Sequence, residues 1–106
     1  KVLVARVLPR LINRLDNAVP LARRLPTDCF GALLSLVYNR GTGAFSRSGD
    51  RSREMVAIKS LVASGDLQGV PVQLRSMKRL WPHFTGLQKR REEEAALFEN
   101  CLKQPN

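Results

Sequence analysis

The chain has 106 residues, of which 43% are hydrophobic, enough for one compact domain with a modest core and too few for two. No apolar run approaches the roughly 20 residues that a membrane-spanning helix needs, so membrane insertion is not expected. The formal net charge is +9, from 18 Lys and Arg against 9 Asp and Glu, and most of the basic residues are Arg. This excess favours anionic partners, namely nucleic acid, an anionic membrane surface or bacterial wall polymers.

The start of the chain does not have the pattern of a signal peptide, because its apolar residues at 2–4 are soon interrupted by Arg6 and Pro9. The first residue is Lys1 and not an initiating Met, as expected of a piece of a longer protein. The route by which the protein would be delivered cannot be inferred from this stretch.

Cysteine and histidine are scarce, and their spacing does not match a metal site. The two cysteines, Cys29 and Cys101, are too few for a disulfide scaffold, and His83 is the one histidine. We therefore expect neither a metal nor another cofactor. Both cysteines fall among apolar residues on helical patterns, which favours buried free thiols over a disulfide.

The first helix is predicted from apolar residues that recur at intervals of three and four between Val4 and Leu15. Pro9 falls inside this pattern, so it either kinks the helix or marks its first turn. Residues 17–28 contain two prolines and are typical of a connector.

The second helix is predicted to start at Thr27 and Asp28, with the Thr27 hydroxyl as its cap. Nearly every residue over 29–38 is apolar or small, which is the pattern of a central helix that is buried on all sides. Gly41 supplies the left-handed residue with which helices often end.

Two more helices are predicted in the middle of the chain. The third follows a polar loop and is capped by Asp50 or Ser52, and the fourth starts near Pro71 and closes at Pro82. The last helix is predicted to begin at Thr85, because residues 85–88 fit a T-x-x-Q capping box. Since no alternating strand is present, the expected fold is all-α, with about five helices and one of them central and buried.

The sequence does not predict a catalytic residue. A general acid needs a partly buried carboxyl with a raised pKa, and none of the nine acidic residues is flanked in a way that suggests one. The run at 92–94 is typical of a solvated face, with Glu94 closest to the apolar stripe. His83 lies in a linker and does not form a Ser-His-Asp pattern, and Gly41-Thr42-Gly43 lacks the ending of a phosphate-binding loop.

Three cations open the last helix, where the helix dipole disfavours positive charge. They are Lys89, Arg90 and Arg91, and the acids follow them. One interpretation is pairing with Glu93 or Glu94 at a spacing of three or four, worth only about 0.2–0.5 kcal/mol per pair. The other interpretation is that at least one arginine reaches an anionic group elsewhere.

The segment LPTDCFGALLSLVYNRGTGAF, residues 25–45, resembles the family-24 glycoside hydrolases, the phage-type lysozymes. In that family a Leu-Thr-x-x-x-Phe-x-Ala-Leu-x-Ser helix runs into an Asn-x-Gly-x-Gly-x-Phe turn. The matching residues here are Leu25, Phe30, Ala32, Leu33, Ser35, Asn39, Gly41, Gly43 and Phe45. Residues 61–81 and 86–98 are similar to the helix pair ending in Trp and the closing Gly-Leu-x-x-Arg-Arg helix of the family. Pro26 stands where the family usually has Thr.

The resemblance implies the C-terminal helical lobe of a lysozyme, without the N-terminal lobe that carries the general-acid Glu. Residues 1–106 would form a single helical domain, with 1–16 as the end of the inter-lobe helix and 27–106 as the lobe. The chain would then supply the substrate-cleft wall of a muramidase that hydrolyses the MurNAc-GlcNAc β-1,4 bond, and would be inactive alone.

The resemblance also places candidate binding residues. The residues expected to face the sugar chain are Tyr38, Asn39, Arg40, Gly41 and Thr42. Trp81 would pack near the cleft floor, and Arg90 and Arg91 would make electrostatic contacts between lobes. The plain alternatives are that 39–41 only ends a helix and that Tyr38 and Trp81 belong to the core.

Three hypotheses for the function follow. The first is part of a peptidoglycan-degrading muramidase acting in the bacterial periplasm or cell wall, and the second is a non-catalytic wall-binding or interaction module. The third is a basic helical nucleic-acid binder, which is disfavoured because the arginines are scattered and only six residues are aromatic. The expected partners are peptidoglycan and a complementary N-terminal catalytic lobe or an inhibitor or immunity protein.

Overall fold

The computed structural model describes residues 2–41, 43–45 and 49–103 of the chain. Within these ranges the elements are all helical, and no strand is present, so the predicted all-α class is confirmed. The α-helices are α1 Val2–Ala18, α2 Thr27–Arg40, α3 Arg53–Ser64, α4 Gly69–Ser76 and α5 Thr85–Lys103. The short 3₁₀ helices are η1 Ala22–Arg24, η2 Gly43–Phe45, η3 Asp50–Ser52 and η4 Met77–Leu80.

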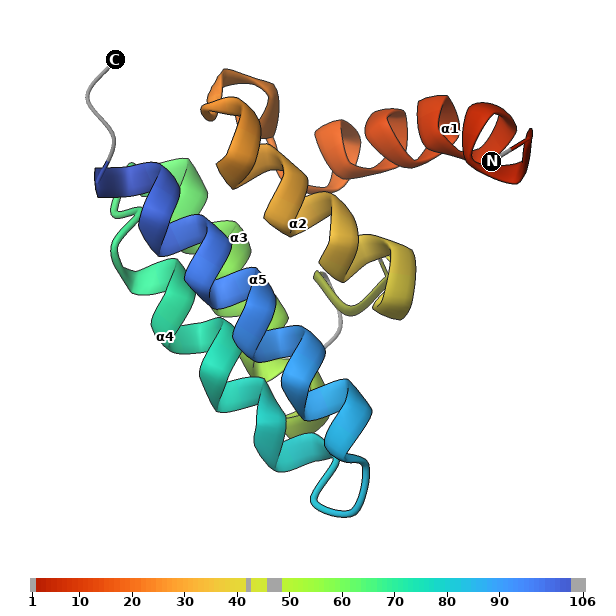
Figure 1. Ribbon diagram of the computed structural model, residues 1–106. Helices are drawn as coiled ribbons and strands as arrows, with labels where there is room; N and C mark the ends of the chain where they lie inside the picture. Colours follow the sequence, from red (N-terminus) through yellow and green to blue (C-terminus); the bar gives the residue numbers. More distant parts are fainter. Residues whose placement is uncertain (1, 42, 46–48, 104–106) are drawn as a thin grey trace.

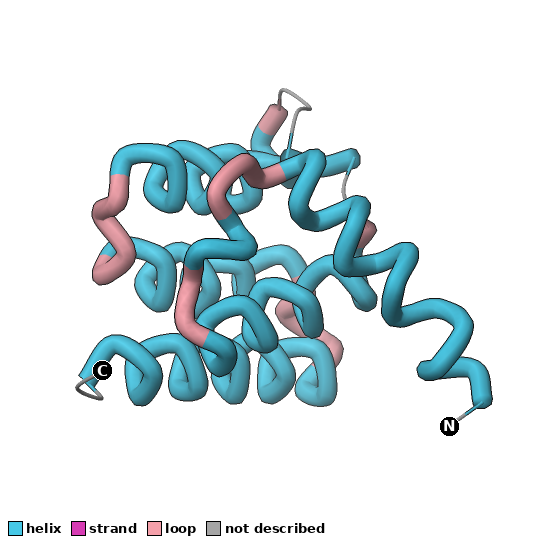
Figure 2. Tube along the Cα trace, turned by 90° about the horizontal axis from the view of Figure 1, so that it is seen from above, coloured by secondary structure: helices cyan, strands magenta, loops and turns pink. Residues whose placement is uncertain are grey.

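Helix α1 contains Pro9 in its interior, so the proline does not mark the first turn. Leu11 and Leu15 lie one turn apart on the face that is buried against the other helices. The chain leaves α1 through Leu21, which has a φ of 76° and precedes η1. In Figure 2 the first turns of α1 extend beyond the other helices, while its last turns lie over them.

Helix α2 begins at Thr27 as predicted, but the predicted cap is wrong. The capping position is Pro26, and no side chain makes a capping hydrogen bond there. Pro26 contributes its carbonyl, which accepts from the Phe30 amide at 2.9 Å. At the other end the chain reverses at Gly41, with a φ of 77°, and the Gly41 amide donates to the Val37 carbonyl at 2.7 Å. The glycine stop is therefore confirmed.

The predicted fourth helix is interrupted, since α4 ends at Ser76 and continues as the tighter turn η4. Helix α5 begins at Thr85 as predicted. The predicted capping box is not formed, because the side-chain nitrogen of Gln88 donates to the Trp81 carbonyl at 2.7 Å. Gln88 thus ties the start of α5 to the residue that follows η4.

Helices α2, α4 and α5 pack closely, with α5 lying between the other two, and α3 packs on α4 (Figure 1). Helix α1 lies on the opposite side of α2 from α5. Helix α5 also buries five residues, so α2 is not the one central helix that the sequence predicts. On α2, residues 38 and 39 are exposed, and five others enter the core. These residues are Cys29, Ala32, Leu33, Leu36 and Val37.

Cys29 of α2 and Cys101 of α5 form a disulfide, with their Cα atoms 5.7 Å apart. The expectation of two free thiols is therefore wrong. Both residues do lie on buried faces, as the apolar pattern predicts, but the packing of α2 on α5 brings these faces together. The bond closes a separation of 72 residues and adds a covalent link to the packing and the Ser35–Glu94 hydrogen bond that join the two helices.

None of the helices over the described residues is long and apolar enough to cross a membrane. Four polar or charged residues are also buried with the apolar core. They are Ser52, Glu54, Arg91 and Glu94.

Candidate functional site

The end of α2 presents polar and aromatic groups at the surface. Tyr38 is 58% exposed, which argues against the core alternative for this residue. The Asn39 side-chain nitrogen donates to the Ser35 carbonyl one turn earlier, at 2.9 Å. This bond fixes the amide against α2. Thr42, the last of the predicted sugar-facing residues, lies outside the described residues.

Trp81 is half-buried, and its ring lies near two guanidinium groups, one from α2 and one from α5. The Arg40 guanidinium carbon lies 5.4 Å from the ring centroid, and that of Arg91 lies 5.6 Å from it. Both distances are within the range of cation–π attraction. The Arg40 side chain also donates to the Arg51 carbonyl at 3.0 Å. Trp81 therefore connects the end of α2 to the first turns of α5.

Arg91 is fully buried, and its carboxylate partner lies one turn later on the same helix. The Arg91 guanidinium contacts both carboxylate oxygens of Glu94, at 2.6 and 2.8 Å. The Ser35 hydroxyl donates to the same carboxylate at 2.6 Å and so links α2 to α5. The structure thus gives Arg91 a partner inside this chain, unlike the contact with another lobe that the sequence predicts.

Burial raises the pKa of Glu94, and the hydrogen bonds from Ser35 and Arg91 offset this effect only in part. The sequence placed Glu94 nearest the apolar stripe but gave no sign of its raised pKa. A spacing of three residues between Arg91 and Glu94 was the one available signal.

Arg90 differs from its neighbour because it is exposed. It lines an open cavity of about 480 Å³ at the start of α5. The other lining residues are His83, Phe84, Thr85, Gly86 and Leu87. Phe84 is 61% exposed, so this end of the structure combines an uncovered aromatic ring with a cation. The predicted role of Arg90 between lobes stays a prediction.

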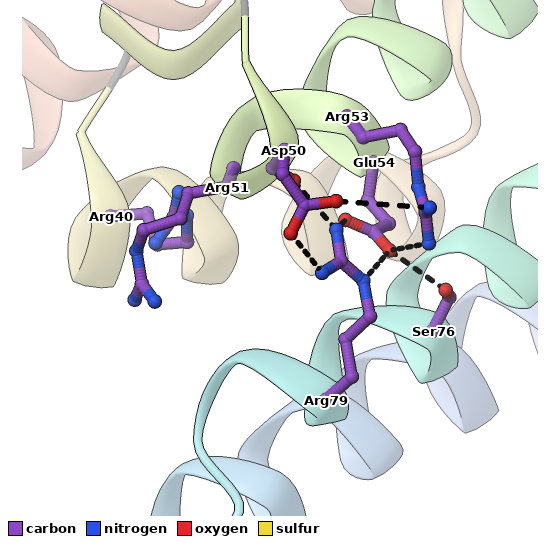
Figure 3. Close-up of polar contacts among 7 residues, drawn as sticks. All are labelled: Arg40, Asp50, Arg51, Arg53, Glu54, Ser76 and Arg79. Carbon is purple, nitrogen blue, oxygen red and sulfur yellow. Dashed lines mark hydrogen bonds and ion pairs between the residues drawn. The ribbon is translucent and has the colours of Figure 1, made fainter.

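A second charged cluster, which the sequence does not predict, surrounds Glu54 at the start of α3 (Figure 3). The Glu54 side chain is buried and accepts from the Arg79 guanidinium at 2.8 and 3.0 Å. It also accepts from the Ser76 hydroxyl at 2.8 Å and from Arg53 at 3.3 Å. Figure 3 shows the Arg79 guanidinium between the carboxylates of Glu54 and Asp50, and the Arg79–Asp50 distance is 2.7 Å.

The donors around Glu54 decide its protonation state. Burial alone would raise the pKa of Glu54, but hydrogen bonds from Arg79 and Ser76 outweigh it and lower that pKa to about 2. The carboxyl is therefore ionised at neutral pH and already surrounded by donors. Asp50, which the sequence treats as a helix cap, instead makes an ion pair with Arg79.

These two buried carboxylates hold elements together. Glu54 joins α3 to α4 and η4, and Glu94 joins α5 to α2. Both are surrounded by cationic and hydroxyl groups of this chain. Over the described residues, no three His, Cys, Asp or Glu side chains gather in the way that a metal ion requires.

The family model described as phage lysozyme matches residues 2–94, most of the chain. The chain belongs to the phage lysozyme family. This family of lysozyme-like muramidases agrees with the resemblance carried by residues 25–45. No curated protein and no solved structure matches the chain significantly.

Proposed function

We propose that this chain is the C-terminal lobe of a muramidase and forms one wall of the cleft that holds peptidoglycan. Helix α1 would be the end of the helix that joins the two lobes, and residues 27–106 the lobe itself. The match to the phage lysozyme family over residues 2–94 is the observation that carries this proposal. The bond hydrolysed would be the β-1,4 linkage from MurNAc to GlcNAc, in the bacterial periplasm or cell wall.

The glycan would lie against the turn after α2. Tyr38 is exposed and offers a ring face on which a sugar can pack, as aromatic side chains with a polar tip do at many interfaces. Arg40 and Gly41 follow on the same turn, and Trp81 supports Arg40 from beneath at 5.4 Å. The Trp81 contact would hold Arg40 in place before the substrate arrives, which lowers the entropic cost of binding.

The chemistry itself would come from a preceding lobe. A general-acid Glu there would protonate the glycosidic oxygen while a water attacks the sugar carbon. In inverting glycosidases, two carboxyl groups stand about 6.5–9.5 Å apart to admit that water. The exposed Arg90 would face the carboxylates of that lobe across the cleft, and the buried Arg91–Glu94 pair would fix the first turns of α5 behind it.

The test uses purified peptidoglycan sacculi and two readouts. Co-sedimentation measures binding by the chain alone, and turbidity measures lysis with and without an N-terminal lysozyme lobe added as a separate polypeptide. We expect the chain to bind sacculi without clearing them, and Tyr38→Ala to weaken binding about tenfold, the loss of roughly 1.4 kcal/mol of contact energy. Val72→Ala is the matched control, because Val72 is 62% exposed on α4.

Two results would contradict the proposal. Lysis by the chain alone would show that the general acid is not supplied by another lobe. Binding that is unchanged by Tyr38→Ala would remove the turn after α2 from the substrate surface. Binding without lysis under every combination of lobes would favour the alternative, a non-catalytic wall-binding module.

A further inference from the structure

We propose that a groove between α1 and the C-terminal end of α2 binds a carboxylate of the peptide stem that branches from the glycan. The groove has a volume of about 300 Å³. It is lined by Arg10, Leu11, Arg14, Val37, Tyr38 and Gly41. This inference rests on the proposed function, because the stem belongs to the same substrate, and it adds a second subsite beside the turn after α2.

The positive charge of the groove comes from two arginines on one helix face. Arg10 and Arg14 are four residues apart on α1, so their side chains are neighbours. Both are exposed, and neither forms a hydrogen bond or an ion pair with another described residue. Like charges at this spacing destabilise a helix, and an anion bound between them would remove the repulsion.

The acid nearest to them on α1 is already paired elsewhere. Asp16 forms an ion pair with Arg23 of η1 at 3.4 Å, and Arg23 also donates to Asn13 at 2.9 Å. At roughly 100° per residue, Asp16 lies about 120° around the helix from Arg10 and about 160° from Arg14, away from the groove. The wall contributed by α2 carries no acid, so the charge of the two arginines is directed into the groove uncompensated.

The rest of the lining suits an amino-acid chain. Leu11 and Val37 are buried and give an apolar floor for methyl groups. Gly41 has no side chain, and a Cβ placed there would meet nothing within 4 Å, so this edge of the groove is open. A planar guanidinium matches a carboxylate through two parallel hydrogen bonds, and a pair of guanidiniums can hold both oxygens.

The position of the groove selects the source of the carboxylate. Tyr38 and Gly41 belong both to the groove and to the turn on which we place the glycan. A peptide stem attached to a sugar on that turn would therefore enter the groove without leaving the protein surface. A phosphate on a separate polymer would satisfy the same arginines but has no such tether to this turn.

The test measures binding of the 106-residue chain to three ligands by calorimetry. They are a glycan-peptide with free stem carboxylates, the same compound with those carboxylates amidated, and a peptide-free glycan. We expect the free carboxylates to tighten binding about tenfold over the amidated compound, as a charge-assisted hydrogen bond does. The double substitution Arg10→Gln and Arg14→Gln should abolish this difference.

The control removes two positive charges outside the groove, through Arg24→Gln and Lys89→Gln, and should retain the difference. Arg10→Lys with Arg14→Lys keeps the charge and should retain part of it, which separates charge from fold. Equal binding of the free and amidated compounds, or full retention by the Gln pair, would overturn the proposal. Teichoic acid binding as tightly as the glycan-peptide, with the same loss in the Gln pair, would reassign the groove to phosphate.

The peptide-free glycan distinguishes failure of this subsite from failure of the proposed function. If the peptide-free glycan does not bind, while free carboxylates still tighten binding of the glycan-peptide, the carboxylate subsite in the groove is supported and the sugar-facing role of the turn is contradicted. If the peptide-free glycan binds, but free and amidated glycan-peptides bind equally, the role of the turn is supported and the carboxylate subsite is contradicted.

Discussion

Glu54 and Glu94 are both buried carboxylates, yet the pKa of Glu54 is lowered and that of Glu94 is raised. Glu54 accepts hydrogen bonds from Arg79, Ser76 and Arg53, which together outweigh the cost of burial. Among the described residues, Glu94 accepts from Ser35 and Arg91 alone, and these donors offset the cost of burial only in part. The number of hydrogen-bond donors around each buried carboxylate therefore decides whether its pKa falls or rises. The ionised form of Glu54 is the one that its donors stabilise.

We predict that Glu54→Gln lowers stability most at neutral pH. The folded-state pKa of Glu54 lies below its ordinary value, so its stabilisation is present above about 4.5 and is lost as the pH falls towards 2. The shift corresponds to roughly 2–3 kcal/mol once screening of the exposed side of the cluster is allowed for. Urea unfolding at pH 7 and pH 3 measures this. A difference between Glu54→Gln and the native chain that stays constant between these pH values would contradict it.

We predict that Arg91→Met destabilises the fold by about 3–5 kcal/mol, because it leaves the Glu94 carboxylate buried without its cation. The double substitution Arg91→Met with Glu94→Leu removes both charges and should cost less than Arg91→Met alone. Denaturant unfolding of the three variants forms the double-mutant cycle that isolates the pair. Additive losses would show that the two side chains act independently.

At the scale of residues, the sequence did not predict how these buried charges pair. The Glu54–Arg79 pair spans 25 positions and depends on the packing of α3 against α4, which no local pattern shows. The Arg91–Glu94 pair lies within one helix turn and was foreseen as a possible spacing. Its burial was not foreseen, because an arginine run at a helix start is typical of an exposed surface.

At the scale of elements, the sequence predicted where helices begin better than it predicted which side chains cap them. The starts of α2 and α5 at Thr27 and Thr85 were predicted correctly, from a threonine cap and a T-x-x-Q pattern. The capping side chains were wrong, since Pro26 occupies one cap and Gln88 turns to Trp81. Caps depend on neighbouring elements, which a local pattern does not contain.

We predict that Gly41→Ala destabilises the end of α2, whereas Gly31→Ala does not. Gly41 has a φ of 77° and a ψ of 179°, a region almost restricted to glycine, so alanine there costs about 1–3 kcal/mol. Gly31 lies inside α2 with space for a Cβ, and alanine should stabilise it by roughly 0.5–1 kcal/mol. Thermal unfolding compares the two. A higher melting temperature for Gly41→Ala would contradict the assigned turn.

For the whole molecule, the family was recognisable from short motifs, whereas the arrangement of charge was not. The Asn-x-Gly-x-Gly-x-Phe turn is local and therefore visible in the sequence around Asn39. The groove of Arg10, Arg14 and Tyr38 joins two helices and exists only once α1 packs on α2. The same holds for the disulfide, because its two cysteines lie 72 residues apart.

That disulfide gives the last prediction, because it joins the first turn of α2 to the last turn of α5. Closing a loop of this length removes entropy from the unfolded chain, worth about 2–4 kcal/mol. Cys29→Ala with Cys101→Ala, or reduction by a thiol, should therefore lower the melting temperature by roughly 10–20 °C. Thiol should leave the melting temperature of the alanine pair unchanged, which makes that variant the control. A native chain whose melting temperature is insensitive to thiol, although its cysteines are shown to be reduced, would mean that packing of α2 on α5 suffices without the covalent link.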